Sequence, residues 1–147
     1  MKPPAIAVEG LSKRFGRRLA VDNLTFQVPA GSVCGFLGRN GAGKSTTIRM
    51  MMNLLDPSAG KVTLLGLDSR RDHTALMGRI GYVSESPALY ESMKVGELVR
   101  FTAAFYRRWN GGRVDELLDR FAIDRSQRVR HLSRGTHAQL EIGRAHV

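Results

Sequence analysis

The sequence predicts an α/β fold with a β-rich N-terminal part and a helical C-terminal part. Three observations support this prediction. Short apolar runs with strand-like patterns recur up to about residue 85. A glycine-rich segment, residues 38–46, connects one of these runs to a helical pattern. Further along the chain, apolar residues recur twice at i, i+3, i+4 and i+7, which is the spacing of one helix face.

The N-terminal part contains the predicted strands, at residues 6–9, 24–28, 33–37, 62–65 and 80–83. The first is expected at a sheet edge, and the second is expected to be half-buried because its apolar residues alternate with polar ones. The third is a continuous apolar run, which is typical of a buried strand. Cys34 lies in this run and is interpreted as a small buried hydrophobic residue. One cysteine cannot form an internal disulfide, so we expect a reducing, cytosolic setting.

Helices are predicted wherever apolar residues share one face. The helix after the glycine-rich segment is expected to present Ile48, Met51, Met52 and Leu55. Two later helices are separated by the break Asn110-Gly111-Gly112. Their predicted faces are Val95, Leu98, Val99 and Thr102, followed by Phe105 or Tyr106, and then Val114, Leu117, Leu118 and Phe121.

The segment from Gly38 to Thr46 fits G-x-x-x-x-G-K-[ST], the phosphate-binding P-loop. Glycines let the backbone turn tightly, so that successive N–H groups form an anion nest at a helix N-terminus. Lys44 is expected to reach the β- and γ-phosphates, and the Ser45 hydroxyl to ligate Mg²⁺. We therefore predict an ATP site with Mg²⁺, in which Thr47 contacts the α-phosphate side and the cradle consists of Gly38, Asn40, Gly41, Gly43, Lys44, Ser45 and Thr46.

Charge and composition limit the other classes of function. The chain is 42% hydrophobic and 24% charged, as in a globular protein, and no apolar run is long enough to span a bilayer or to form a signal peptide. The net charge of +10 raises nucleic-acid binding as an alternative. Acidic residues interrupt the densest basic stretch and no aromatic residues alternate with it, which favours a solvated face or a subunit contact. The stretch consists of Arg120, Arg125, Arg128, Arg130 and Arg134.

Along the chain, the segment Ser12-Lys13-Arg14-Phe15-Gly16, the P-loop, residues 81–85 and residues 132–135 follow one another. In this order they resemble the nucleotide-binding domain of ATP-binding cassette (ABC) transporters, and most closely the bacterial type-2 exporter group. Phe15 lies where that family has an aromatic residue that stacks on adenine, although a packed strand-end residue is the alternative. Glu85 ends the segment Gly81-Tyr82-Val83-Ser84-Glu85, which resembles the family's glutamine loop. The resemblance implies a role for Glu85 at Mg²⁺ or the attacking water, and a surface carboxylate is the alternative.

Leu132-Ser133-Arg134-Gly135 resembles the family's L-S-G-G-Q signature. Ser133 and Gly135 match it, whereas Arg134 and Thr136 depart from it. The resemblance implies that Ser133 and Gly135 contact the nucleotide of a partner domain, and a simple helix start with Ser133 as N-cap is the alternative.

The resemblance implies a P-loop NTPase core that is incomplete at its C-terminus. Residues 1–140 are interpreted as a partial ABC domain, with a nucleotide core at 1–85 and a helical subdomain at 86–140. No apolar strand ending in Asp-Glu follows Gly135, so no catalytic residue of the family is present and the fragment is expected to be inactive. Residues 141–147 match a translated sequencing adapter, and a genuine divergent tail is the alternative.

By this resemblance, the chain is an ATP-binding subunit that couples ATP binding and hydrolysis to membrane transport. The expected partners are a second nucleotide-binding domain, arranged head to tail, and transmembrane permease subunits near residues 87–95, with Tyr90 and Met93 as apolar anchors. The expected location is the cytoplasmic side of the cell membrane. The alternative is a soluble ABC-type ATPase that acts on ribosomes or nucleic acid without membrane partners.

Overall fold

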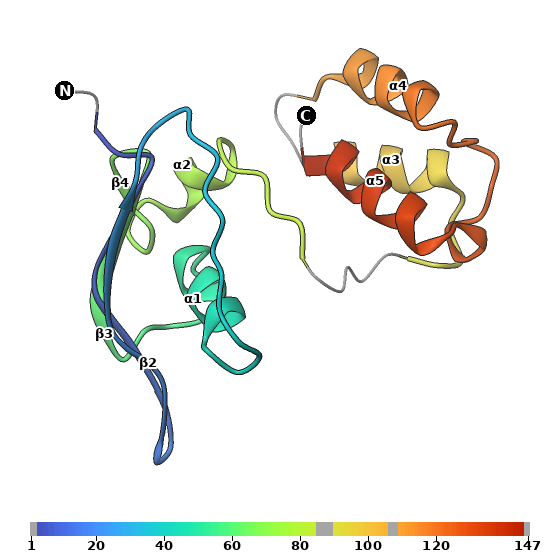
Figure 1. The fold of residues 1–147 in the computed structure, drawn as a ribbon. Helices are drawn as coiled ribbons and strands as arrows, with labels where there is room; N and C mark the ends of the chain where they lie inside the picture. Colours follow the sequence, from blue (N-terminus) through green and yellow to red (C-terminus); the bar gives the residue numbers. More distant parts are fainter. Residues whose placement is uncertain (1–2, 85–89, 106–108, 146–147) are drawn as a thin grey trace. The chain divides into compact units, whose positions relative to one another are not determined.

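A computed structural model describes residues 3–84, 90–105 and 109–145, with side chains up to residue 141. The chain divides into two compact units, Met1–Arg79 and Ile80–Val147, which we call the N-terminal unit and the helical unit. Figure 1 shows the sheet in the first and the longer run of helices in the second. The boundary predicted after residue 85 falls outside the described residues.

The N-terminal unit is built on an antiparallel sheet of order β2-β1-β3-β4. Its strands are β1 (Ile6–Phe15), β2 (Arg18–Val28), β3 (Ala59–Leu64) and β4 (Leu67–Asp68). The prediction of a short edge strand at 6–9 is wrong, because β1 is an interior strand of ten residues. A tight turn at Gly16 pairs one side of β1 with β2, and β3 covers the other side.

Residues 33–37 are not a strand, contrary to the prediction, and neither are residues 80–83. Val33 and Leu37 are 103% and 92% exposed, and Cys34 is exposed rather than buried. Apolar composition alone does not make a strand, because the backbone also needs a neighbouring ladder. Within the described ranges, no strand pairs with residues 33–37. Phe36 nevertheless stacks on Phe26 of β2, with ring centroids 5.6 Å apart.

Two helices, α1 (Lys44–Met51) and α2 (His73–Met77), lie on one side of this sheet (Figure 1). The helix after the glycine-rich loop is confirmed, but its predicted face is wrong. The buried residues of α1 are Thr47 and Met50, and the helix ends before Leu55. The helix is shorter than the apolar spacing suggested, so its contact face is defined by its first two turns.

The helical unit comprises α3 (Val95–Ala103), α4 (Gly111–Arg120), a 3₁₀ turn at Val129–His131 and α5 (Arg134–Ala145). Most residues of the two predicted faces are buried: Val95, Leu98, Val99 and Thr102 on α3, and Val114, Leu117 and Leu118 on α4. Phe105, however, is 72% exposed, Phe121 is only half-buried, and Tyr106 lies outside the described residues. The buried apolar residues of the two faces other than Leu117 share one core cluster with Ile123, Val129 and Leu140. At the predicted break, the Asn110 side chain accepts a hydrogen bond from the amide of Arg113 and caps α4.

Across the ranges that the structure describes, no helix is both long enough and apolar enough to cross a membrane.

Candidate functional site

The glycine-rich loop leads directly into the first turn of α1. Gly43 is the N-cap of this helix and adopts a left-handed conformation with φ of 86°. The first i→i−4 bond of the helix runs from the amide of Thr47 to the carbonyl of Gly43, at 2.8 Å. The amides of residues 44–46 therefore belong to the first turn, where a helix offers donors to an external acceptor. This is an anion-binding geometry.

Gly43 is also where the loop packs against the sheet. A Cβ atom built on Gly43 would lie 2.5 Å from the carbonyl oxygen of Ala20 and 2.9 Å from Cγ2 of Val21. Both neighbours belong to β2. No side chain fits at such distances, so glycine is required here for space as well as for its conformation. The contact fixes the start of α1 against the second strand.

Lys44 closes the loop on itself. Its ammonium donates to the carbonyl of Gly38 at 2.6 Å and to that of Arg39 at 3.0 Å. The amide of Ala42 also donates to the Arg39 carbonyl, at 3.1 Å, which makes a tight turn in the middle of the loop. These bonds hold the Lys44 ammonium against the loop, close to the amide donors at the start of α1. Charge and amides together suit a phosphate chain.

The hydroxyl residues that follow Lys44 have different environments. Ser45 is exposed at the start of α1, Thr46 is half-buried, and Thr47 is only 1% exposed. The Thr47 hydroxyl donates to the Gly43 carbonyl at 2.9 Å. Mg²⁺ prefers oxygen ligands and commonly combines a few protein oxygens with those of a bound phosphate. The exposed hydroxyl of Ser45 fits this role, and within the described part of the chain no cluster of three acidic, His or Cys residues could hold a metal without a nucleotide.

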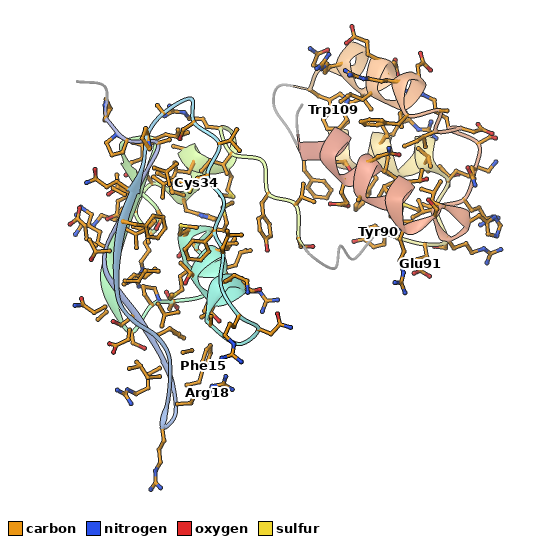
Figure 2. All side chains as sticks on the ribbon, in the orientation of Figure 1. Phe15, Arg18, Cys34, Tyr90, Glu91 and Trp109 are labelled. Carbon is orange, nitrogen blue, oxygen red and sulfur yellow. The ribbon has the colours of Figure 1, made fainter. Side chains whose placement is uncertain are left out.

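Phe15 lies at the tip of the β1–β2 hairpin, directly opposite Arg18 (Figure 2). The ring is 49% exposed, and the Lys13 ammonium lies 5.2 Å from its centroid. The same ammonium donates to the Asp56 carbonyl. An exposed aromatic ring held by a cation on one side offers its other surface for stacking.

The signature-like residues belong to the helical unit. Ser133 precedes α5, and its hydroxyl oxygen accepts a hydrogen bond from the Thr136 amide at 3.1 Å. The hydroxyl also lies 2.8 Å from that of Thr136. Ser133 and Gly135 are both exposed, so the capped helix start is accessible to a partner. Glu85 lies outside the described residues.

Sequence reasoning missed the contribution of β2 to this site. Ala20 and Val21 support Gly43, and Arg18 approaches Gly41, with its Nη2 atom 3.9 Å from the position of a Cβ on that glycine. The signal in the sequence was the Gly16-Arg17 turn, which predicts a tight hairpin that returns the chain past Phe15.

A model of the family described as "ABC transporter" matches residues 21–147. The chain belongs to this family. The match begins on β2 and includes the whole P-loop and the segment around Ser133. It also includes residues 141–147, for which the sequence suggested an adapter.

Curated members of the ABC family resemble almost the whole chain. The chain is 36% identical over 147 residues to the daunorubicin resistance ATP-binding protein DrrA3 of Streptomyces coeruleorubidus, covering 97% of this chain and 46% of that protein. It is 32% identical over 142 residues to the bacitracin transport ATP-binding protein BcrA of Bacillus licheniformis, covering 95% and 46%. It therefore spans about half the length of these relatives.

Solved ABC structures share the fold. The ATP-binding subunit of an ABC transporter superposes with a TM-score of 0.82 at 28% identity, covering 96% of this chain and 61% of the other. CbiO1 from Clostridium perfringens, part of the transporter complex cbiONQ, gives a TM-score of 0.77 at 26% identity, covering 97% and 61%. The P-loop NTPase fold of the ABC family is thereby confirmed.

Proposed function

We propose that this chain is the ATP-binding part of an ABC transporter subunit and that it binds ATP with Mg²⁺ at the P-loop. The observation that carries the proposal is the geometry of residues 38–46. Lys44 crosses the loop to two of its carbonyls, and Gly43 begins a helix whose first amides follow at once. A polyphosphate offers acceptors that suit both the cation and the amides.

The test of ATP binding is a calorimetric titration of the chain with unmodified ATP and Mg²⁺. Lys44→Ala removes the cation of the motif and is expected to weaken binding by about 2–4 kcal/mol, as for a charge-assisted contact in a partly desolvated site. Arg39→Ala is the matched control, since it removes one positive charge from the same loop at an exposed, variable position of the motif. Equal affinity in the wild type and Lys44→Ala would contradict the proposal.

The proposal extends to the partners of the family. A second nucleotide-binding domain would meet Ser133 and Gly135, which lie exposed at the start of α5. Permease subunits would hold the protein at the cytoplasmic face of the membrane. The similarity to a bacitracin transport protein and a daunorubicin resistance protein supports these partners. Crosslinking of a cysteine placed at Ser133 to one placed at Gly41, dependent on ATP, would test the head-to-tail arrangement.

An aromatic cluster in the helical unit supports the permease contact. Tyr90 is 54% exposed, and its ring meets Phe101 edge to face with centroids 5.2 Å apart. Phe101 meets Phe105 in the same way, at 5.1 Å. Met93, which we expected to be a second anchor, packs against the core cluster instead. Exposed aromatic rings are typical anchors of protein interfaces, so loss of permease co-purification in Tyr90→Ala tests this contact.

A further inference from the structure

The side chain of Arg18 approaches the P-loop from the hairpin that carries the exposed Phe15 ring. The two residues face each other across the hairpin, as partners in the register of β1 and β2 (Figure 2). On the loop side, Nη2 of Arg18 is 3.9 Å from the Cβ position of Gly41. The guanidinium therefore lies beside a loop that already holds the Lys44 ammonium.

A β-bulge directs Arg18 toward the loop. Lys13 pairs with Val21, but Arg14 pairs with Leu19, so Ala20 is an extra residue in β2. Side chains alternate between the faces of a strand, and residues 18 and 21 would lie on opposite faces in a regular strand. The extra residue places both on the face of Lys13 and Phe15. That face carries the loop, because Val21 touches the Cβ position of Gly43.

Arg18 has no carboxylate partner among the residues that the structure describes. Of the ion pairs found in the described part of the chain, none involves Arg18, and the residue is exposed. An exposed arginine without a carboxylate is common on protein surfaces. Here, however, the residue pairs with one whose ring suits a base, and its guanidinium approaches a loop that suits phosphates. A bidentate donor at that place matches the oxygens of a phosphate.

We infer that Arg18 is a nucleotide-binding residue, the second cation of the site, and that it binds the phosphate chain near its ribose end. This inference rests on the proposed ATP site and adds the direction in which the nucleotide lies in it. The base would stack on Phe15, Arg18 would contact the phosphate nearest to the ribose, and Lys44 would act further along the loop. Because that phosphate is present in ATP and ADP alike, Arg18 should contribute equally to the binding of both nucleotides.

The experiment compares Arg18→Gln with Arg14→Gln in the same calorimetric titration, with ATP and with ADP. Arg14 is the matched control because it lies on the same hairpin but pairs with Leu19 on the opposite face. Unmodified nucleotides are needed, since a dye on the ribose would occupy the space between Phe15 and the loop. We expect Arg18→Gln to weaken both nucleotides by about ten-fold, the usual value of a charged hydrogen bond, and Arg14→Gln by less than about two-fold.

Two further readouts, together with the affinities, decide the outcome. Raising the salt concentration should weaken nucleotide binding less in Arg18→Gln than in the wild type, because one charge contact is gone. Circular dichroism melting should show the same midpoint for both variants, since Arg18 is exposed. If Arg18→Gln binds like Arg14→Gln, or loses affinity for ATP alone, the assignment is overturned. If the wild type binds no ATP, or Lys44→Ala binds equally well, the proposed function fails first and the assignment fails with it.

Discussion

Gly43 of the P-loop and Ala20 of β2 meet backbone to backbone, with only 2.5 Å between the Ala20 carbonyl oxygen and the position of a Cβ on Gly43. Ala20 is also the extra residue of the bulge in β2. The same irregularity therefore supports the start of α1 and directs Arg18 toward the loop. The glycine-rich loop thus packs directly against the hairpin that carries Phe15.

Gly43→Ala is expected to destabilise the N-terminal unit. The new Cβ would collide with a backbone oxygen, and alanine would have to adopt φ of 86°. Together these effects should lower the free energy of unfolding by about 2–4 kcal/mol. Urea denaturation measures the loss. Gly35→Ala is the control, because its Cβ would meet only Leu37, at 3.9 Å. Similar stability of the two variants would contradict the close contact.

Phe15→Ala is expected to weaken ATP binding by about 1–3 kcal/mol, the usual contribution of stacking on a base. Phe15→Tyr should be almost neutral because the aromatic face remains. Since Phe15 is 49% exposed, neither variant should unfold the protein. Leu19→Ala truncates an apolar residue on the opposite face of the same hairpin and should leave the affinity unchanged. A tyrosine variant as weak as the alanine variant would indicate a packing role for the ring.

The environment of Asp68 should make the stability of the N-terminal unit depend on pH. Its carboxylate accepts hydrogen bonds from the amides of Arg71 and Arg70, at 3.1 and 3.0 Å, and these bonds lower its pKa below the ordinary value of 3.8. When the pKa of a carboxyl is lower in the folded state than in the unfolded state, the carboxyl stabilises the fold. This stabilisation is complete when the pH lies above the pKa of the unfolded state, and it is lost as the pH falls through the pKa of the folded state.

Asp68→Asn should therefore be less stable than the wild type at neutral pH, and the difference should shrink below pH 3.8. Urea denaturation over a series of pH values measures this difference. Asp22→Asn, at an exposed position of β2, removes the same charge elsewhere in the unit. A difference between the wild type and Asp68→Asn that stays constant down to the lowest pH would disprove the linkage.

Residues 1–147 are expected to bind ATP without hydrolysing it at a useful rate. Phosphoryl transfer needs a positioned water and further groups at the metal, and no Asp or Glu pair follows the signature-like segment to supply them. Phosphate release should remain at the background level of Lys44→Ala. A longer version carrying an added Asp-Glu strand from a relative is the comparison. Equal turnover of the two would show that catalytic groups lie elsewhere in these residues.

The elements that could be predicted from the sequence are those that local spacing determines. The faces of α3 and α4 follow from the positions of Val95, Leu98, Val114 and Leu118, and Asn110 caps α4 at the predicted break. Residues 33–37 could not be predicted, because pairing with another strand, rather than composition, decides whether an apolar run is a strand. The exposure of Cys34 follows from the same cause.

The glycine-rich loop and the helix after it were predictable because the glycines and Lys44 form a motif with a physical reason for each residue. The position of Arg18 was not predictable. It depends on one extra residue in β2, and the sequence around Ala20 carries no glycine or proline that would mark a bulge. Alternation alone would have placed Arg18 on the wrong face.

The bulge at Ala20 also limits how the length of this hairpin can change during evolution or engineering. Deleting Ala20 would remove the bulge and leave Arg18 and Val21 on the same face of a regular strand. Inserting one residue between them would instead exchange the two faces, so that Leu19 would replace Arg18 beside the loop, whereas inserting two residues would preserve the faces. When such hairpins are exchanged between related proteins, a strand that is one residue longer here would therefore have a larger effect than a strand that is two residues longer.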